Sequence, residues 1–390
     1  MQPASFDAIV VGTGQAGPPL AEALARAGRS VAVIERGAFG GTCVNNGCTP
    51  TKAMVASAHA AHMARRAAEY GVEIAGDVRV DMRKVKARKD AIVGKSTQGV
   101  EKWMRSTRGV TVIGGHARFT GPRTIAVEGR ELTAELVFLD VGGRSAHPSD
   151  EQSGGVPYLT SETVMDVDFV PAHLLVVGGS YVGLEFGQMF RRFGSRVTVV
   201  EMGPRLIGRE DEDISQAVRE ILEGEGIDVR TNAKCIGLGR EGDGVAMSLD
   251  CSEGAPRVQG THVLWAAGRR PNTDDLGLER AGVETDARGN IKVGEDLQTN
   301  VRGVYALGDC NGRGAFTHTA YNDFEIVRDN LLHGAHRKLS DRIPIYALYT
   351  DPPLGRIGMS LDEARKSGTQ VLVGKYPMKR VARAVERGET

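Results

Sequence analysis

The feature that most constrains what this chain can fold into is an apolar, glycine-rich pattern that occurs twice. Each copy predicts a buried strand, then a helix, then a second buried strand that ends in a glutamate. The expected elements span residues 7–12, 20–27 and 30–34 in the first copy and residues 173–178, 184–193 and 195–200 in the second. Gly12 precedes Glu35 by 23 positions, and Gly178 precedes Glu201 by the same 23 positions. Two strand–helix–strand units of equal length predict two nucleotide-binding folds.

The first copy contains the full glycine fingerprint of a dinucleotide site, in the run Gly-Thr-Gly-Gln-Ala-Gly at residues 12–17. Gly12 permits the tight turn, Gly14 lets the backbone approach a diphosphate, and Gly17 lets the helix pack closely on the strand. The phosphates would then face the positive end of the helix. Glu35, at the end of the next strand, is expected to accept hydrogen bonds from an adenosine ribose.

The second copy reads Gly-Gly-Ser-Tyr-Val-Gly from Gly178 to Gly183, so that Ser180 replaces the middle glycine. A small serine side chain still allows a phosphate to approach the backbone. Glu201 favours NAD over NADP because a carboxylate repels a 2′-phosphate, and the nearby Arg205 weakens that preference. Two dinucleotide sites in one chain predict hydride transfer between a nicotinamide and a flavin. We therefore expect FAD together with NADH or NADPH, with NADH slightly favoured.

The rest of the chain extends both copies into complete domains. Each copy is followed by an apolar strand that breaks at glycines, at residues 136–143 and 263–268. The charged stretch 80–106 predicts a surface helix, and residues 303–307 predict a last strand. A length of 390 residues exceeds what one core usually serves. We expect an α/β protein with two Rossmann-like domains, in which residues 1–150 and 276–340 bind FAD, residues 151–275 bind NAD(P), and residues 341–390 begin an α+β interface domain.

The composition is that of an ordinary soluble protein, with 41% hydrophobic and 25% charged residues. Lys plus Arg and Asp plus Glu both number 49, so the net charge of zero gives no field that would attract nucleic acid or an acidic membrane. No apolar run approaches the roughly 18 to 20 residues of a membrane-spanning helix, and residues 1–5 lack the basic and apolar regions of a signal peptide. We therefore expect a cytoplasmic protein without a nucleic-acid or membrane partner.

The five cysteines are too sparse for a disulfide-stapled secreted domain, but Cys43 and Cys48 form a close pair just beyond the first copy. The short ring between them predicts a disulfide that is easily reduced. A helix that begins near Cys48 would lower the pKa of that thiol, and Lys52 would stabilise a reduced, anionic flavin. The other cysteines, Cys235, Cys251 and Cys310, are interpreted as small core or surface residues.

Two other interpretations of the close pair stay open. Cys43 and Cys48 could be two unlinked buried thiols. They could also bind zinc together with His59 and His62, because tight cysteine spacing and a His-x-x-His pair are both present. In a reducing compartment, a close pair is more typical of catalysis or metal binding than of a structural disulfide.

With these residues in place, the chain resembles the pyridine nucleotide-disulfide oxidoreductases of the glutathione reductase and dihydrolipoyl dehydrogenase type. The segment Gly-Gly-Thr-Cys-Val-Asn-Asn-Gly-Cys-Thr-Pro-Thr-Lys at residues 40–52 closely matches the redox signature of that family. Residues 204–214, residues 268–272 and the pair Gly308-Asp309 also fall where the family has motifs. Residues 324–329 and 351–359 resemble its mercuric reductase-like branch, which also contains reactive-chlorine resistance flavoproteins.

The resemblance implies a role for each residue of the redox centre. Cys48 would be the thiolate beside the flavin, and Cys43 would be the thiol that exchanges with substrate. Tyr181 would cover the flavin until nicotinamide displaces it, and Glu185 would pair with Lys52; a packed core tyrosine and a solvent-facing glutamate are the structural alternatives. The expected cofactor-binding residues are Gly12, Gly14, Gly17, Glu35, Gly41, Thr42, Lys52, Ala117, Gly142, Asp309, Thr317, Gly178, Ser180, Gly183, Glu201 and Gly268.

The chain also departs from the family pattern. The family's interface domain carries a His-Pro-Thr segment and a Glu that serve as an acid–base pair for the other subunit's cysteines, and no such segment follows Tyr346. We therefore expect a truncated interface domain, in a family whose members are homodimers. We likewise expect a protein without the C-terminal cysteine pair and the N-terminal metal-binding domain of many mercuric reductases. Asp140 stands where the family prefers a small apolar residue.

The leading hypothesis is an FAD-dependent NAD(P)H:disulfide or metal-ion oxidoreductase of the mercuric reductase-like branch. Electrons would pass from NAD(P)H via FAD to the disulfide of Cys43 and Cys48, and then to a small-molecule or metal-ion acceptor that reacts with thiols. The first alternative is dihydrolipoyl dehydrogenase, which Glu201 favours and the missing acid–base pair disfavours. The second alternative is a non-catalytic, redox-sensing or truncated flavoprotein.

Overall fold

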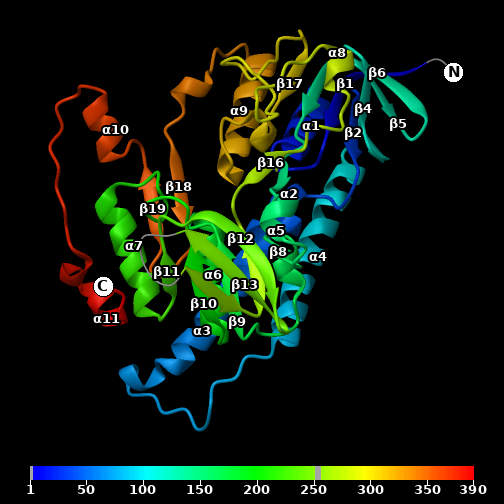
Figure 1. Ribbon diagram of the computed structural model, residues 1–390. Helices are drawn as coiled ribbons and strands as arrows, with labels where there is room; N and C mark the ends of the chain where they lie inside the picture. The colour runs from blue at the N-terminus through cyan, green and yellow to red at the C-terminus, as the bar shows by residue number, and fades with distance from the viewer. Residues whose placement is uncertain (1–2, 251–255) are drawn as a thin grey trace. The chain divides into compact units, whose positions relative to one another are not determined.

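The computed structural model describes residues 3–250 and 256–390 (Figure 1). Cys251 lies outside these residues, as does the side chain of Cys235, and so do the predictions made for them. The chain forms two compact units, each assembled from three segments. The first unit comprises Met1–Met54, Lys84–Ala146 and Gly268–Arg342, and the second comprises Val55–Arg83, His147–Ala267 and Ile343–Thr390.

The first unit is built on a mixed seven-stranded sheet with the order β3-β2-β1-β6-β5-β4, in which β17 also pairs with β6 (Figure 1). The neighbours of β1, β2 and β17 are parallel, whereas β4, β5 and β6 form an antiparallel meander. The strands are β1 (Ala4–Val11), β2 (Val31–Glu35), β3 (Val110–Gly114), β4 (Arg118–Gly121), β5 (Thr124–Val127), β6 (Arg130–Leu139) and β17 (Val304–Ala306).

Helix α1 (Gly17–Arg26) connects β1 to β2, and buries Leu20 and Leu24 in the core of this unit. The close packing of α1 depends on glycine, because a Cβ on Gly17 would lie only 2.5 Å from the carbonyl oxygen of Gly12. Helix α9 (Thr317–His333) also contacts α1. The N-terminus of α1 is therefore held at the carboxyl end of β1, the edge where parallel sheets bind ligands.

The second unit contains a parallel five-stranded sheet with the order β11-β10-β9-β15-β8. A three-stranded antiparallel sheet, β12-β13-β14, packs on it, with Leu175 and Met247 in the shared core. The strands are β8 (Leu159–Thr160), β9 (His173–Val177), β10 (Arg196–Val200), β11 (Asp228–Arg230), β12 (Lys234–Glu241), β13 (Gly244–Asp250), β14 (Arg257–Gly260) and β15 (His262–Trp265). Helix α6 (Tyr181–Phe193) connects β9 to β10, and α7 (Glu212–Gly224) leads to β11.

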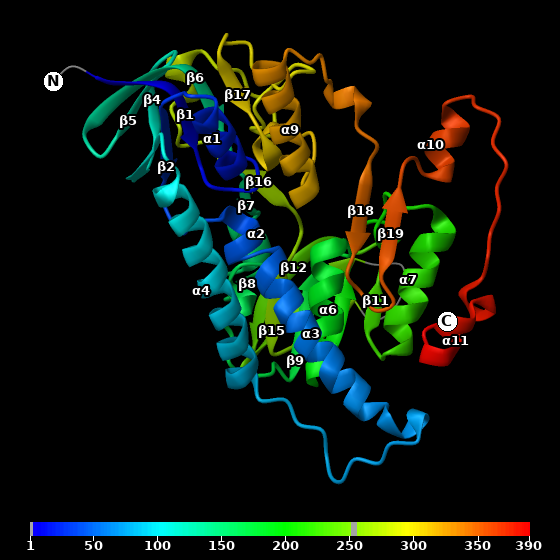
Figure 2. The same ribbon diagram turned by 180° about the vertical axis from the view of Figure 1, so that it is seen from behind.

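The remaining elements are mostly short. Helix α2 (Gly41–Asn45) leads into the long helix α3 (Cys48–Arg65), as Figure 2 shows, and β7 (Gly143–Ser145) pairs with β16 (Arg269–Pro271). An extended segment without regular structure follows α10 and leads to the short helix η5, which precedes α11 (Figure 1). The other elements are η1 (Ala67–Tyr70), α4 (Met82–Ser106), α5 (Asp150–Ser153), η2 (Thr163–Asp166), α8 (Leu278–Ala281), η3 (Gly308–Asn311), η4 (Leu339–Asp341), β18 (Ile345–Leu348), β19 (Leu354–Ile357), α10 (Leu361–Lys366), η5 (Met378–Arg380) and α11 (Ala382–Arg387).

The internal repeat and the α/β fold class are confirmed, with small shifts in the element boundaries. Strands β1 and β9 end just before Gly12 and Gly178, because these glycines have φ of 100° and 113° and so leave the extended conformation. Helices α1 and α6 begin earlier than expected, because the turn after each glycine leads directly into the helix. In the described part of the chain, no helix is both long and apolar enough to cross a membrane.

Candidate active site

Cys43 and Cys48 lie on two consecutive helices of the first unit. Cys43 lies within α2, and Cys48 is the first residue of α3, where a helix start was expected. The side-chain amide of Asn45 donates to the carbonyl oxygens of Phe39 and Gly41, both at 3.0 Å, and so holds the short helix in place. Both thiols are free, and they are hydrogen-bonded to each other. The fold therefore brings the two sulfur atoms into direct contact.

Thr317 contacts both sulfur atoms from the first turn of α9. Its hydroxyl oxygen lies 3.0 Å from the sulfur of Cys48 and 3.5 Å from the sulfur of Cys43. The sequence had assigned Thr317 only to cofactor binding. One hydroxyl group therefore reaches both sulfurs of the cysteine pair.

The pKa values of the two thiols are shifted in opposite directions. The hydrogen bond from Cys43 is the largest influence that lowers the pKa of Cys48, and Thr317 and the charge of Lys52 lower it further, to about 6. The hydrogen bond to Cys48 and burial both raise the pKa of Cys43 above its usual range. A position at the start of a helix also favours a thiolate. Near neutral pH, Cys48 is therefore the thiolate of the pair and Cys43 is the thiol.

Asp309 and Arg269 form an ion pair in the same unit as the two cysteines. Asp309 follows Gly308, whose φ of 73° turns the chain out of β17, and the Arg269 guanidinium lies 3.8 Å from its carboxylate. Burial raises the pKa of Asp309, and Arg269 opposes that rise. Arg269 also donates to the carbonyl oxygen of Gly143 and lies 3.5 Å from the hydroxyl of Thr42. Arg269 thus links its own segment with those of Thr42, Gly143 and Asp309, all within one unit.

Glu35 is held by the backbone of its own loop. One carboxylate oxygen accepts from the backbone N–H of Thr13 at 2.9 Å and from its hydroxyl at 2.6 Å, and the other accepts from the N–H of Gly37 at 2.9 Å. A carboxylate offers about four lone pairs, so these contacts leave capacity for a ribose hydroxyl. Glu35 thus shapes the turn and keeps capacity for a further hydrogen bond.

The start of α1 fits a diphosphate group. Its N-cap residue, Ala16, has no side-chain cap, and Gly14 and Gln15 border a cavity of about 460 Å³. In the described part of the chain, no hydrogen-bond acceptor lies on the backbone N–H of Gly14 or Gln15. A Cβ on Gly41 would lie 2.9 Å from the Cα of Gly14, so these backbones approach closely. Open N–H groups at a helix start are what a dinucleotide phosphate requires, and the expected FAD fits here.

The second unit contains the matching arrangement. A Cβ on Gly183 would lie 1.9 Å from the carbonyl oxygen of Gly178, so α6 packs on β9 as α1 packs on β1. Ser180 is the N-cap of α6, and its side chain makes no cap hydrogen bond. Glu201 accepts from the backbone N–H groups of Gly179 and Gly203, both at 2.7 Å. This helix start is therefore also available to an anionic ligand.

Tyr181 extends from α6 toward a buried acid. Its hydroxyl donates to the carboxylate of Glu210 at 3.3 Å, and its ring packs edge-on against Tyr346 at 5.6 Å. Glu210 also accepts from the hydroxyl of Tyr346 and, at 2.8 Å, from Nε of Arg356. Burial and the contact with Tyr346 raise the pKa of Tyr181. Tyr181 is therefore neutral and tethered within its own unit.

The other expected residues lie in both units. Ala117 is buried in the core of the first unit, and Gly142 and Gly268, with φ of 62° and 119°, flank the β7–β16 pair of that unit. Lys52 belongs to the first unit and Glu185 to the second, where Glu185 accepts from the backbone N–H of Tyr349 at 2.9 Å. The pairing of Lys52 with Glu185 stays a prediction.

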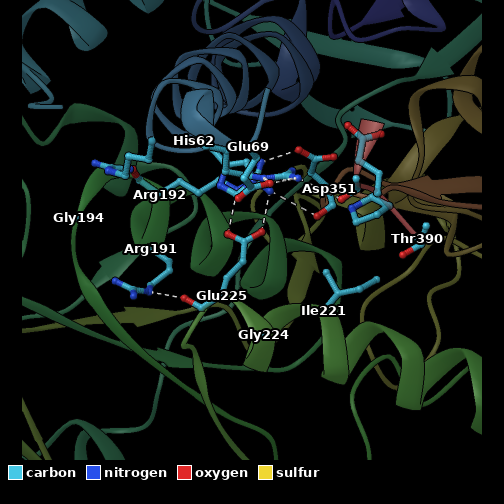
Figure 3. A pocket seen from close by; sticks show the side chains of 15 residues that line it. His62, Glu69, Arg191, Arg192, Gly194, Ile221, Gly224, Glu225, Asp351 and Thr390 are labelled. Atoms are coloured by element: carbon cyan, nitrogen blue, oxygen red, sulfur yellow. Dashed lines mark hydrogen bonds and ion pairs between the residues drawn. The ribbon is translucent and has the colours of Figure 1, made fainter. Parts of the chain in front are cut away.

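A second hollow, of about 540 Å³, lies in the second unit and is lined by paired charges (Figure 3). Arg192 lies between Glu225 and Asp351, with nitrogen–oxygen distances of 2.6 and 2.7 Å. Asp351 also contacts His59 at 2.9 Å, and Arg191 donates to the carbonyl oxygen of Glu225 at 2.6 Å. Because these arginines already have partners, we interpret the hollow as structural.

Sequence reasoning missed the contacts of Thr13, Arg269 and Glu210. Arg269 and Glu210 lie inside segments that had matched family motifs, but a motif does not say which atoms a side chain contacts. In the described part of the chain, no group of three or more His, Cys, Asp or Glu side chains could hold a metal ion. The zinc interpretation of Cys43 and Cys48 therefore has no support.

Comparison with known proteins gives a consistent result. A family model described as pyridine nucleotide-disulphide oxidoreductase matches residues 6–323. The dihydrolipoyl dehydrogenase of Thermus scotoductus is 34% identical over 386 residues, which cover 98% of this chain and 83% of that protein. The mercuric reductase of Streptomyces lividans is 34% identical over 390 residues, which cover 99% and 82%.

A solved structure resembles this chain over its whole length. It is a Cu(II) complex of RclA, an HOCl-induced flavoprotein disulfide reductase from Escherichia coli. The TM-score is 0.88 at 31% identity, and the match covers 100% of this chain and 85% of the other. Sequence and structure therefore point to the same group of enzymes.

Proposed function

This chain belongs to the pyridine nucleotide-disulphide oxidoreductase family, which uses FAD and NAD(P)H, and we propose that Cys43 and Cys48 are its redox-active pair. The observation that carries the proposal is the contact between their sulfur atoms together with their opposite acidities. In each turnover, one hydride equivalent and one proton reduce the S–S bond to two thiols. A thiol-reactive acceptor then takes up the electrons.

The two cysteines have different tasks in this proposal. Cys48 is the thiolate that faces the flavin, supported by the lowered pKa that Cys43, Thr317 and Lys52 produce. Cys43 stays protonated because its pKa is raised. It attacks the acceptor once its proton is removed, since the thiolate is the nucleophile. Thr317 donates a hydrogen bond to whichever sulfur is negative.

The residues around the first fingerprint would hold FAD, which when bound accepts a hydride from NAD(P)H and reduces the disulfide. The N–H groups of Gly14 and Gln15 would bind its diphosphate, and Glu35 its adenosine ribose. Asp309, which pairs with Arg269, would bind the ribityl and phosphate portion of FAD. Gly41, Thr42, Ala117, Gly142 and Lys52 complete the proposed site.

The second fingerprint would bind the nicotinamide dinucleotide, with Gly178, Ser180 and Gly183 near its phosphates, and Gly268 is a further proposed cofactor-binding residue. Glu201 favours NADH over NADPH because its carboxylate repels a 2′-phosphate. Tyr181 is the residue we propose to cover the flavin, and its tether to Glu210 sets its resting position. Glu185 would hold Lys52. The four-segment domain division expected from the sequence is part of the same proposal.

The acceptor we favour is a metal ion or a small disulfide, as in the mercuric reductase-like branch. The name of the Streptomyces lividans relative and the Cu(II) complex of the Escherichia coli protein support this choice. Dihydrolipoyl dehydrogenase activity is the second candidate, favoured by the Thermus scotoductus relative and by Glu201. We propose a cytoplasmic homodimer in either case.

Steady-state assays separate these candidates. With NADH as the electron donor, we expect reduction of Hg(II) or Cu(II). With dihydrolipoamide as the electron donor, we expect little reduction of NAD. Cys43→Ser should abolish metal-ion reduction, whereas Cys310→Ser, which changes a buried thiol outside the pair, should retain it. Full metal-ion reduction by Cys43→Ser would refute the disulfide route.

A further inference from the structure

Asp140 is a buried acid directly behind the first glycine fingerprint. It follows β6, its side chain is only 6% exposed, and one carboxylate oxygen accepts from the backbone N–H of Gly17 at 2.7 Å. The N–H of Ala16 also donates to this side chain. A Cβ on Gly14 would lie 2.8 Å from the same oxygen, so the carboxyl group lies against the fingerprint. Asp140 thus caps α1 from inside the protein.

The internal repeat shows that the fold does not require this acid. In the second unit the equivalent position after β15 is Ala266. A Cβ on Gly178 would lie 2.6 Å from the carbonyl oxygen of Ala266, as a Cβ on Gly12 would lie 2.2 Å from that of Asp140. The backbone N–H of each residue donates at 2.8 Å to the last residue of the neighbouring strand, Val11 of β1 or Val177 of β9. An acid at this position therefore distinguishes the first fingerprint from the second.

The charged groups near Asp140 are acids. Asp309 faces it from η3 and Glu35 from β2, and both disfavour a second negative charge, while α1 offers only backbone N–H groups. The Cys310 thiol of η3 also lies nearby, with its own pKa raised by burial and by Asp140. Burial is the main cause that raises the pKa of Asp140 to about 8.

A carboxylate and a diphosphate would compete for the same end of α1. Both are stabilised by the positive end of the helix dipole, and two anions in a buried site repel each other strongly. The carboxylate is fixed in place by the fold, whereas its proton can be gained or lost. Binding of the diphosphate therefore favours the neutral acid.

We propose that Asp140 couples FAD binding to proton uptake: the side chain is protonated when the diphosphate of FAD lies at the start of α1, and its ionisation weakens cofactor binding. This inference rests on the proposed placement of FAD at the first fingerprint. It assigns Asp140 a positioning role, because its proton decides whether the helix end is available to the phosphates.

The consequence is a pH-dependent dissociation constant for FAD. Below the pKa of free Asp140 the constant should be level, because the acid is already neutral. Above that pKa each FAD that binds must bring one proton with it, and the constant should rise by up to about tenfold per pH unit. Asp140→Asn keeps the hydrogen-bond acceptor for Gly17 and removes the ionisation.

The test uses full-length protein stripped of FAD. FAD fluorescence gives the dissociation constant from about pH 6 to about pH 10, and calorimetry in two buffers of different ionisation enthalpy gives the number of protons taken up. For the wild type we expect weaker binding above about pH 8 and uptake approaching one proton there. Asp140→Asn, and Asp140→Ala, which copies the second unit, should bind with no such slope.

Asp7→Asn provides the control, because Asp7 lies on β1 of the same unit, is exposed, and its carboxylate accepts hydrogen bonds from Ser30. This variant should keep the wild-type slope. A wild-type slope in Asp140→Asn, or no proton uptake by the wild type, would overturn the proposal. Failure of every form to bind FAD at any pH would instead contradict the placement of FAD.

Discussion

The hydroxyl oxygen of Thr317 lies 3.0 Å from the sulfur of Cys48, the residue with which α3 begins. Thr317 lies 269 positions further along the chain, in the last α-helix of the first unit. This contact brings a hydroxyl group together with a thiol at a helix start. Several neighbours lower the pKa of Cys48, and Cys43 does so more than Thr317.

Removal of Cys43 should raise the pKa of Cys48 more than removal of the Thr317 hydroxyl does. The hydrogen bond from Cys43 is the largest influence that lowers this pKa, and Thr317 contributes less. We expect a rise of about one unit in Thr317→Val and a larger rise in Cys43→Ala. The pH dependence of Cys48 alkylation by iodoacetamide measures both. Thr107→Val, which removes a hydroxyl that donates to the carbonyl oxygen of Trp103, serves as control. A rise in the pKa of Cys48 as large in this variant as in Thr317→Val would contradict the role of Thr317.

Replacement of Arg192 should be among the most destabilising charge changes in the second unit. Its side chain is 5% exposed and forms ion pairs with both Glu225 and Asp351. Arg192→Met would leave two half-buried acids without their shared cation, at a cost of up to about 3 to 5 kcal/mol in the free energy of unfolding. The exposed pair of Arg219 with Glu223 offers a matched control, and Arg219→Met should cost less than about 1 kcal/mol. Urea unfolding compares the two variants.

The same ion pairs predict how stability depends on pH in acid. Burial alone would raise the pKa of Asp351, but its bonds to Arg192 outweigh this, and the pKa is lowered below 3.8. The carboxylate therefore contributes stability above the pKa of the unfolded chain, and that contribution is lost as the pH falls through the folded value. In Asp351→Asn the free energy of unfolding should fall less steeply below about pH 4. An unchanged slope in this range would be evidence against the pairing.

Asp140 should affect the cofactor-free protein in the opposite direction. Its folded pKa is raised to about 8, so between the unfolded value of 3.8 and that pH the folded state holds a proton that the unfolded chain releases. This contribution is complete below the unfolded pKa and declines as the pH rises, by at most about 1.4 kcal/mol per unit. Relative to the wild type, Asp140→Asn should therefore gain stability as the pH rises from about 4 to about 8. Parallel unfolding curves for both proteins at all pH values would refute this.

Glu201 should decide between the two nicotinamide dinucleotides. In Glu201→Ala we expect kcat/KM for NADH to fall by roughly tenfold, with a smaller change for NADPH, because the ribose contact and the repulsion of a 2′-phosphate are lost together. Both values should decrease somewhat, since Glu201 also holds the N–H groups of Gly179 and Gly203. Glu220→Ala on the exposed face of α7 is the control. An equal loss for both dinucleotides would show that Glu201 acts only on the loop.

The local features of the fold were predictable because they depend on neighbours in the sequence. Glycines and apolar runs predicted both copies of the repeat, and the expected helix start near Cys48 is found at that residue. These signals work because strand and helix periodicity and helix-start chemistry are set within a few residues.

The long-range contacts were not predictable in the same way. Arg192 meets Asp351 across 159 positions, and Arg356 meets Glu210 across 146. Such pairs depend on how distant segments pack, and no local pattern specifies the partner. Asp140 is the clearest case: in the sequence it was an unexplained departure, and only the structure shows it against Gly14 and Gly17.

The most direct test of the central claim is an anaerobic titration of the FAD-loaded protein with NADH. If Cys43 and Cys48 form a disulfide beside the flavin, two electrons should produce a long-wavelength absorbance band, which arises when the Cys48 thiolate lies against oxidised flavin, and two alkylatable thiols should appear with it. Bleaching of the flavin at two electrons, without the band and without new thiols, would contradict the account.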